Sequence, residues 1–586
     1  MINMKRVLFL LILIPQILHG QNALNMIQSD LESGQISHEE YLVNRALAIY
    51  EPAKLAEGYR DAALSEKPLK SGTMIAADLK RHWNLLSTSD QNLLADYLTR
   101  PALPYSVISP SGQFKIHYTL SGNQAVSATD VNPENGIPDY VDRVAESFDY
   151  VHYFETEVLG FAPPPTDLGN GGGDEFDVYI RDFTRIYGQT FFEGKVPGQE
   201  NSYYGYTEID NDYFGFSTSG LDGMRVTSAH EYFHAIHFGY KFKPNDDVFW
   251  EDEVFYYEIS STWMEEIVYD DVNDYHFYLR SFFRNIDMPF DTYDGSYEYG
   301  NCLFNHMLSK KYGNEIIVRV WEHMRSMPAI EAIDAALSEF GSNFDDAHLE
   351  YATWNYFTGS RADTVNYYHE SDEYPEVTYK RIVDFTEDTS FLGTMNQFSY
   401  AYYQVINSET ENGTVFMPVN REDNEGTTSS FTLELSRFTG QLFTEIEEGF
   451  NVRMTVDQLT RWDLLYINET GNTGEYTVQR INPVDPSVLK MKDLIVGLGP
   501  NPFMPDSHDG FSLFYQLKEK SPVTITIMDE NGIEIRKFQF PVKHTGLNSF
   551  HWENSEYGQF PCGSGIYLIM IKADDKFDTT KLAVIR

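Results

Sequence analysis

The 586-residue chain has little cysteine, few basic residues and few long apolar runs. Its two cysteines, Cys302 and Cys562, lie in regions far apart, so no disulfide framework holds the fold together and two buried free thiols are expected. Lys and Arg total 43 against 88 Asp and Glu; this acidic excess repels nucleic acid, which is excluded as a partner. Beyond the N-terminus no segment reaches the roughly 20 apolar residues of a transmembrane helix, so no membrane span is expected.

The N-terminus has a pattern typical of secretory leaders. Lys5 and Arg6 precede the apolar run 7–18, and the small residue Gly20 is followed by a polar sequence. This pattern predicts a signal peptide over residues 1–20. The protein is therefore expected to be secreted, either extracellular or at the cell surface.

Apolar spacing divides the rest of the chain into four regions. Residues 21–103 have helical spacing, which predicts a helical prodomain or support region. Short strands followed by long helical stretches predict an α+β domain over 104–370. Alternating apolar residues between Gly, Asn and Asp turns predict two β-sandwich domains, over 380–487 and 490–586. The predicted fold class is multidomain: an α+β domain preceded by a helical region and followed by two β-sandwiches.

The α+β domain contains the pattern His-Glu-x-x-His. No proline interrupts 225–238, so a helix is expected there, with Gly239 ending it. On a helix His230 and His234 lie one turn apart on one face, where both imidazoles can bind one zinc ion. Glu231 lies beside them, within reach of a water on the metal, and is predicted to be the general base. The alternative is a core helix whose histidines are only hydrogen-bonded.

The third zinc ligand decides the class of site. Metzincins need Gly at position 237 and His at position 240, but this chain has His237 and Tyr240. The remaining choice is a glutamate from a following helix, and we expect Glu258, at the start of a helical stretch. Since a catalytic zinc keeps one position open for water, His237 is expected to have a structural or supporting role. The competing glutamates are Glu251, Glu253, Glu265 and Glu266.

The zinc helix and the stretch 250–266 resemble those of secreted bacterial metallopeptidases of the gluzincin type. The resemblance covers roughly residues 100–365 and implies a zinc peptidase acting on peptides or proteins. Gluzincin aminopeptidases also have a Tyr-Glu-x-Gly element whose tyrosine stabilises the oxyanion, and the segment 297–300 resembles it. This implies a catalytic role for Tyr297, with Tyr299 as the competing choice and simple packing as the alternative.

An acidic loop over 130–142 offers a second metal site. Its spaced side-chain oxygens resemble calcium loops of the EF-hand and dockerin kind, because calcium takes roughly 6–8 oxygen ligands. The resemblance implies Asp130, Asn132 and Asp139 as calcium ligands. An Asx-rich turn without a metal is the alternative.

The last hundred residues resemble an immunoglobulin-like C-terminal sorting domain of type IX secretion systems. The features that carry this resemblance are the segment 499–503, the hairpin 529–532, Trp552 and the segment 564–567. It implies that secretion machinery is a partner of residues 490–586.

Two functions follow from these patterns. The first is hydrolysis of peptide bonds, with the stretch 202–209 expected to be the edge strand that aligns an extended substrate. The second is a non-catalytic surface adhesin or binding protein in which the metal is structural or absent. Glu231 favours hydrolysis, because a purely structural zinc site has no use for that carboxylate.

Overall fold

The computed structural model describes most of the chain from Ala23 to Arg586. The residues that it does not describe are 1–22, 66, 385–388, 407–412, 421–428, 443–444, 457–461, 471–474, 482–493, 506–507, 509, 530–532, 544–545, 554–559, 561–562 and 575. The predicted signal peptide and Cys562 lie among them. Cys302 is buried and free, as expected. Among the described residues no helix is long and apolar enough to cross a bilayer.

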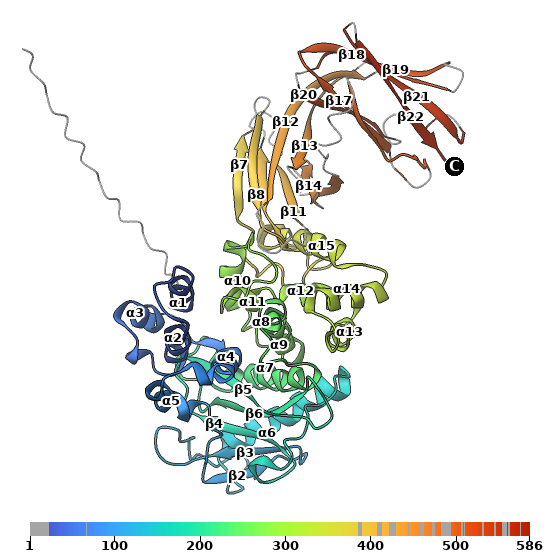
Figure 1. The fold of residues 1–586 in the computed structure, drawn as a ribbon. Coiled ribbons are helices and arrows are strands. Elements are labelled where there is room, and N and C mark those ends of the chain that lie inside the picture. Colours follow the sequence, from blue (N-terminus) through green and yellow to red (C-terminus); the bar gives the residue numbers. More distant parts are fainter. Residues whose placement is uncertain are drawn as a thin grey trace, which may run out of the picture. The chain divides into compact units, whose positions relative to one another are not determined.

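The chain forms two compact units. The first comprises the chain up to Asn285 and Asp291–Glu376, and the second comprises Ile286–Phe290 and Val377–Arg586. The expected multidomain arrangement of helices and several sheets is therefore confirmed (Figure 1).

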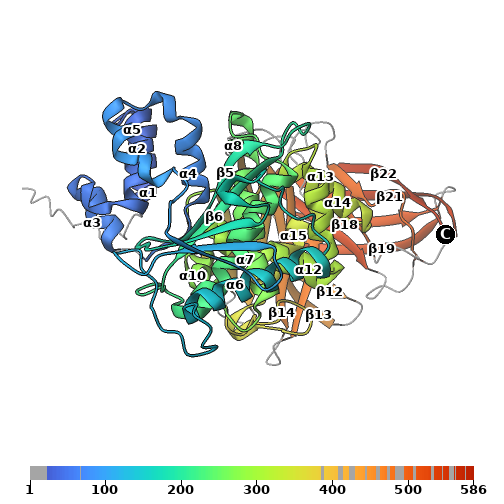
Figure 2. The same ribbon diagram turned by 90° about the horizontal axis from the view of Figure 1, so that it is seen from below.

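The first unit begins with a group of helices that have their own apolar core (Figure 2). The second of them starts at a capping box, in which Ser37 and Glu40 each accept a hydrogen bond from the other's backbone N–H. Leu42, Ala46 and Ile49 of this helix are buried in the core. The helices are α1 (Ala23–Glu32), α2 (His38–Tyr50), α3 (Glu57–Ser65), α4 (Thr73–Arg81) and α5 (Thr88–Leu94).

A six-stranded sheet follows the helices, in the order β1-β5-β6-β4-β3-β2. Its strands are β1 (Leu69–Ser71), β2 (Tyr105–Ile108), β3 (Phe114–Tyr118), β4 (Phe176–Arg181), β5 (Ile186–Lys195) and β6 (Tyr203–Asp210). The expectation of an edge strand over 202–209 is wrong, because β6 is paired on both sides, with β5 and β4. The edge next to β5 carries β1, a strand that comes from the predicted helical region and pairs with β5 in parallel. Such pairing between distant segments leaves no local signal in a sequence.

Helix α7 (Gly220–Tyr240) packs against β5, β6 and α9 and is buried on nearly every side. Gly239 lies inside this helix and does not end it, contrary to expectation. A Cβ at Gly239 would lie 2.8 Å from Cδ of Pro165, so the glycine permits close packing against that loop. The other helices of the unit are α6 (Asp139–His152), α8 (Asp247–Asp252), α9 (Val254–Val268), α10 (His276–Arg284), α11 (Tyr297–Gly300), α12 (Leu303–Tyr312), α13 (Glu315–Met324), α14 (Ala329–Glu339) and α15 (Phe344–Tyr356).

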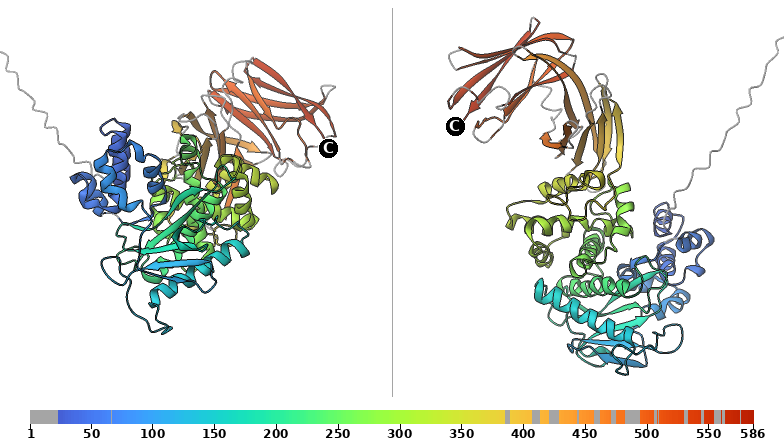
Figure 3. Two further views of the ribbon diagram at one scale, coloured as in Figure 1. Left: turned by 60° about the horizontal axis from the view of Figure 1, so that its bottom comes forward. Right: turned by 180° about the vertical axis from the view of Figure 1, so that it is seen from behind.

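The second unit consists of strands in four sheets (Figure 3). One sheet has the order β15-β14-β11-β10-β7, with β9 beside β11, and another the order β13-β12-β8. Both contribute to one core, since Tyr403 and Phe416 of the first pack with Phe431 and Leu433 of the second. These strands are β7 (Tyr379–Asp384), β8 (Thr389–Met395), β9 (Ser399–Tyr400), β10 (Tyr402–Ile406), β11 (Gly413–Asn420), β12 (Ser429–Leu442), β13 (Glu445–Val456), β14 (Trp462–Thr470) and β15 (Glu475–Ile481).

The last strands form two more sheets, β16-β17-β20 and β19-β18-β21-β22. Phe511 and Trp552 of the first sheet and Ile525 and Ile571 of the second are buried in a common core. These strands are β16 (Ile495–Gly499), β17 (Gly510–Leu517), β18 (Ser521–Met528), β19 (Glu534–Lys543), β20 (Gly546–Glu553), β21 (Gly565–Ala573) and β22 (Lys576–Val584).

Candidate metal centre

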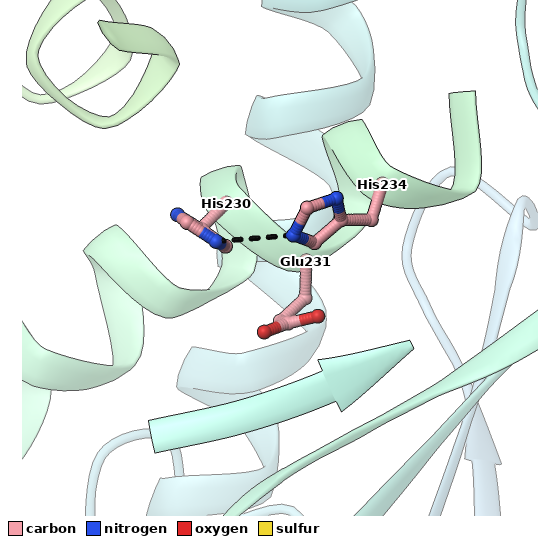
Figure 4. Close-up of side chains that lie close together, drawn as sticks. All are labelled: His230, Glu231 and His234. Atoms are coloured by element: carbon pink, nitrogen blue, oxygen red, sulfur yellow. Dashed lines mark hydrogen bonds between the residues drawn. The ribbon is translucent and has the colours of Figure 1, made fainter. Parts of the chain in front are cut away.

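Helices α7 and α9 bring three side chains to one point. The Nε2 atoms of His230 and His234 are 3.1 Å apart, and Oε2 of Glu258 lies 3.1 Å from the first and 3.5 Å from the second. Figure 4 shows the two imidazoles facing each other on α7, with Glu231 beside them. Each of the three side chains is exposed by 1% or less. Two histidines one helical turn apart and a carboxylate from the next helix therefore form a closed triangle of donor atoms.

The size of this triangle fits a tetrahedral zinc site. Zinc binds nitrogen and oxygen at about 2.0–2.2 Å, which places neighbouring ligand atoms about 3.3–3.6 Å apart. The observed separations of 3.1–3.5 Å lie close to that value. Two histidines and one glutamate are also a common ligand set of catalytic zinc.

The protonation of His230 supports a cation at this point. Its Nδ1 lies 2.7 Å from Oε1 of Glu265, whose other oxygen lies 2.6 Å from the Lys70 ammonium. With this carboxylate ionised by its pairing to Lys70, the ring proton of His230 is on Nδ1. Burial lowers the pKa of His230 and of His234 to about 3, so both rings are neutral. The free lone pair of His230 Nε2 then faces a carboxylate oxygen of Glu258 at 3.1 Å. Two acceptors at this distance repel each other unless a proton or a cation lies between them.

Glu231 lies next to the triangle without being part of it. One of its oxygens is within 4.8 Å of the histidine nitrogens. Its Oε2 accepts hydrogen bonds from Oγ1 of Thr73 at 2.8 Å and of Thr190 at 2.9 Å. Its Oε1 has no hydrogen-bond partner in the described part of the chain. Burial raises the pKa of Glu231 to about 8, against the opposing effect of the Ser71 and Thr73 hydroxyls.

The other candidate glutamates have different surroundings. Glu265 contacts His230 through the far nitrogen of the ring and binds Lys70 at 2.6 Å. Glu253 pairs with Lys241 at 2.6 Å. Glu266 makes no hydrogen bond to either histidine among the described residues, and the side chain of Glu251 lies outside them. Of these glutamates, Glu258 is the one whose oxygen closes the triangle.

His237 lies apart from the donor triangle. Its ring stacks on Trp321, with centroids 3.8 Å apart and an interplanar angle of 11°. Its Nε2 is 3.3 Å from the Ser260 hydroxyl. This position matches the structural role expected from the sequence.

The two tyrosines of α11 point to different surroundings. The ring of Tyr297 packs on Phe282, with centroids 5.0 Å apart. The ring of Tyr299 lies 6.3 Å from that of His230. Burial, and next the charge of Glu258, raise the pKa of Tyr299 well above its usual range, so its hydroxyl keeps its proton. The structure thus brings Tyr299, the competing choice, close to the histidines, whereas Tyr297 lies against an apolar ring.

Three residues of this centre had no signal in the sequence analysis: Lys70, Thr73 and Thr190. Thr73 and Thr190 reach Glu231 through hydroxyls, and Lys70 reaches His230 indirectly, through Glu265. Pro68 and Gly72 interrupt the helical spacing on either side of Lys70 and could have marked a break. No pattern in the neighbouring sequence could have shown that this break lies next to the His-Glu-x-x-His motif in the fold.

The loop 130–142 uses its carboxylates to hold its own backbone. Asp130 accepts from the amides of Asn135 and Gly136 at 3.0 and 2.8 Å. Asp139 accepts from the amides of Val131 and Asn132, both at 2.9 Å, and these bonds lower its pKa. Among the described residues, three or more His, Cys, Asp or Glu side chains come close enough to hold a metal at His230, Glu231 and His234, and not in this loop. The hydrogen bonds of the loop are those of an Asx-rich turn, the alternative to a calcium site.

Comparisons with known proteins leave the family open. No protein-family model matches the chain, and no curated protein matches it significantly. One structural match is to an aminopeptidase A of Legionella pneumophila, solved with aspartic acid. It covers 77% of this chain and 35% of the aminopeptidase, at 9% identity and a TM-score of 0.27. A second match is to PorZ of Porphyromonas gingivalis, a surface component of the type IX secretion system. It covers 33% of this chain and 39% of PorZ, at 11% identity and a TM-score of 0.14. The chain thus spans about a third of the aminopeptidase, and scores this low carry no argument about function.

Proposed function

We propose that this chain is a secreted zinc-dependent peptidase of the gluzincin kind, with His230, His234 and Glu258 as zinc ligands. The observation that carries the proposal is the triangle of 3.1–3.5 Å between two imidazole nitrogens and a carboxylate oxygen. Beside it lies Oε1 of Glu231, which has no hydrogen-bond partner in the described part of the chain. When bound there, zinc would supply Lewis-acid activation of a water molecule and of the scissile carbonyl.

The side chains around the donor triangle supply the other parts of the proposed mechanism. Glu231 takes the proton from the attacking water with Oε1 and passes it to the leaving nitrogen, while its other oxygen is held by Thr190. Glu265 accepts a hydrogen bond from the Nδ1–H of His230. This bond orients the ring so that the lone pair of Nε2 faces the donor triangle. Tyr299 supplies a protonated hydroxyl for the developing oxyanion, in the role that the sequence assigned to Tyr297.

The proposal extends to domains and location. Residues 1–20 are the signal peptide, residues 104–370 the peptidase domain, and the sheets that share cores within 380–487 and 490–586 are two β-sandwiches. The second of these acts as a sorting domain for secretion machinery, and it contributes no side chain to the zinc triangle. The substrate is a peptide or protein outside the cell. Calcium at Asp130, Asn132 and Asp139 is not part of the proposal. Asp130 and Asp139 hold backbone amides of the loop, and the described residues bring no three His, Cys, Asp or Glu side chains together there.

Metal analysis combined with digestion of a peptide library tests this function. The wild-type chain, both intact and after limited proteolysis, is compared with Glu231→Gln, each with and without a chelator. We expect one zinc per chain in both proteins and peptide cleavage only by the wild type without chelator. If neither wild-type preparation, intact or proteolysed, cleaves peptides although both bind zinc, the adhesin is favoured, with the metal in a structural role.

A further inference from the structure

The segment 70–73, which runs from β1 into the first residue of α4, reaches into the proposed metal centre. Strand β1 pairs in parallel with β5, with Leu69 opposite Ile186 and Ser71 opposite Gly188. The amide of Leu69 donates to the Arg185 carbonyl at 2.7 Å, and that of Gly72 donates to the Gly188 carbonyl at 2.9 Å. This edge of β5 is where an extended peptide could pair with the sheet beside α7.

Thr73 is hydrogen-bonded directly to Glu231, the proposed general base. Its hydroxyl donates to Oε2 of Glu231 at 2.8 Å and accepts from the amide of Thr190 at 2.8 Å and from the Ser71 hydroxyl at 2.9 Å. Thr73 itself is fully buried. The hydroxyl therefore has all its hydrogen bonds inside the centre and none to solvent.

Lys70 fixes the same segment by charge. Its ammonium lies 2.6 Å from Oε2 of Glu265 and 2.7 Å from Oδ2 of Asp274, and all three side chains are exposed by 1% or less. Removing one partner from a buried ion pair leaves an uncompensated charge, so the segment is held firmly while the site stays dry.

Together these contacts close the centre to a peptide. His230, Glu231, His234 and Glu258 are each exposed by 1% or less. A cavity of about 530 Å³, partly open to solvent, is lined by Ser71 and Tyr299 and by residues of the N-terminal helices, among them Leu24, Tyr41 and Asp78. Helices α1, α2 and α4 therefore line the space next to Ser71 and Tyr299.

We propose that segment 70–73 is an intramolecular plug on the peptide-binding edge of β5, and that the helical region it belongs to must leave before the enzyme can act. This inference rests on the proposed peptidase function. The plug escapes hydrolysis because the chain turns at Gly72 into α4 and presents the hydroxyl of Thr73 to Glu231 in place of a peptide carbonyl. Release requires hydrolysis of one peptide bond by another peptidase in the connection to β2, where Ala102 and Pro104 are exposed.

A controlled cut in this connection tests the plug. A recognition sequence for a specific protease is inserted between Ala102 and Leu103 of the full chain, which is zinc-loaded, cut and separated by size exclusion in 1 M NaCl. Intact and cut chains are compared for zinc content, for binding of a peptide hydroxamate and for peptide-library hydrolysis. We expect equal zinc content, with hydroxamate affinity and hydrolysis each at least 100-fold higher in the cut and separated chain.

A pair of glycine variants gives a second test without any cut. A Cβ at Gly72 would lie 2.8 Å from both Oε1 of Gln189 and Cδ1 of Ile186. Gln189 cannot move away easily, because its amide binds the Tyr50 hydroxyl and Glu208. Gly72→Ala should therefore loosen the plug and raise hydroxamate affinity of the intact chain about tenfold. Gly58→Ala, on an exposed face of α3 where the nearest atom is 3.9 Å away, should leave it unchanged.

The outcomes separate the plug from the function. An intact wild-type chain that already binds the hydroxamate and cleaves peptides as well as the cut chain overturns the plug and leaves the peptidase standing. A fragment that cannot be separated from the cut chain, even with Gly72→Ala, or a separated chain that loses its zinc, also overturns the plug, because the region is then a permanent support. A separated, zinc-loaded chain that neither binds nor cleaves overturns the peptidase function itself.

Discussion

The helix pair α7–α9 and the loop 130–142 both carry side chains that the sequence analysis marked as metal ligands. In the helix pair, two imidazole nitrogens and a carboxylate oxygen on rigid elements converge at 3.1–3.5 Å. In the loop, the carboxylates of Asp130 and Asp139 each accept two backbone amides. The comparison teaches that spacing finds candidate residues, but that only the convergence of their donor atoms on one point distinguishes a metal site.

Removal of the third ligand should have the largest effect. Glu258→Gln keeps the shape of the side chain but replaces the carboxylate ligand by a neutral amide. We therefore expect zinc affinity to fall by at least ~100-fold. Competition with a chromophoric chelator measures this. Asp130→Asn is the matched control from the loop, and it should leave zinc affinity unchanged; equal losses in both variants would erase the distinction between the two sites.

Glu231→Gln should separate binding from chemistry. Since Glu231 is not a ligand in the triangle, zinc stoichiometry should stay at one per chain. The amide cannot accept the proton of the water, so we expect kcat of the cut chain to fall by ~10²–10⁴-fold. Steady-state kinetics on one library peptide gives the value. Full activity in this variant would contradict the proposed mechanism.

The tyrosine pair sharpens the comparison within α11. Tyr299→Phe should lower kcat by ~10²-fold or more with little change in KM, because an oxyanion donor acts mainly in the transition state. Tyr297→Phe should change kcat less than threefold, since that ring packs on Phe282. The reverse order of effects would restore the role that the sequence assigned to Tyr297.

Helix α7 and its pair of histidines could be predicted because the signal for them is local in the sequence. The spacing of His230 and His234 defines one helical face, and Glu258 follows on the next long helix. Tyr297 and Tyr299 could not be told apart, because residues two apart point to different sides of a helix and nothing in a four-residue helix fixes its rotation. Strand β1 has only three residues and pairs with a segment over a hundred positions later. Order in the sheet depends on such distant pairings, which also explains the wrong edge strand.

The smallest effect is expected in the loop. Calcium or a calcium chelator should shift Tm by less than about 1 °C, because no new ligand binds the folded state. Asp130→Asn should cost about 1 kcal/mol or less, the net value of the exposed hydrogen bonds it weakens. Thermal denaturation with both additives checks this. A rise in Tm that grows with calcium concentration, and that Asp130→Asn abolishes, would show that the loop binds the ion.

The burial of the donor triangle sets how a metal ion can leave it. A chelator cannot reach ligands exposed by 1% or less, so removal has to wait until segment 70–73 lifts away from β5. Loss of metal from the intact chain should then reach a rate that no longer depends on chelator concentration, as amide exchange does when opening limits it. In the cut and separated chain the same rate should rise in proportion to the chelator. The rate of metal exchange would thus measure how often the N-terminal region opens, without any substrate being needed.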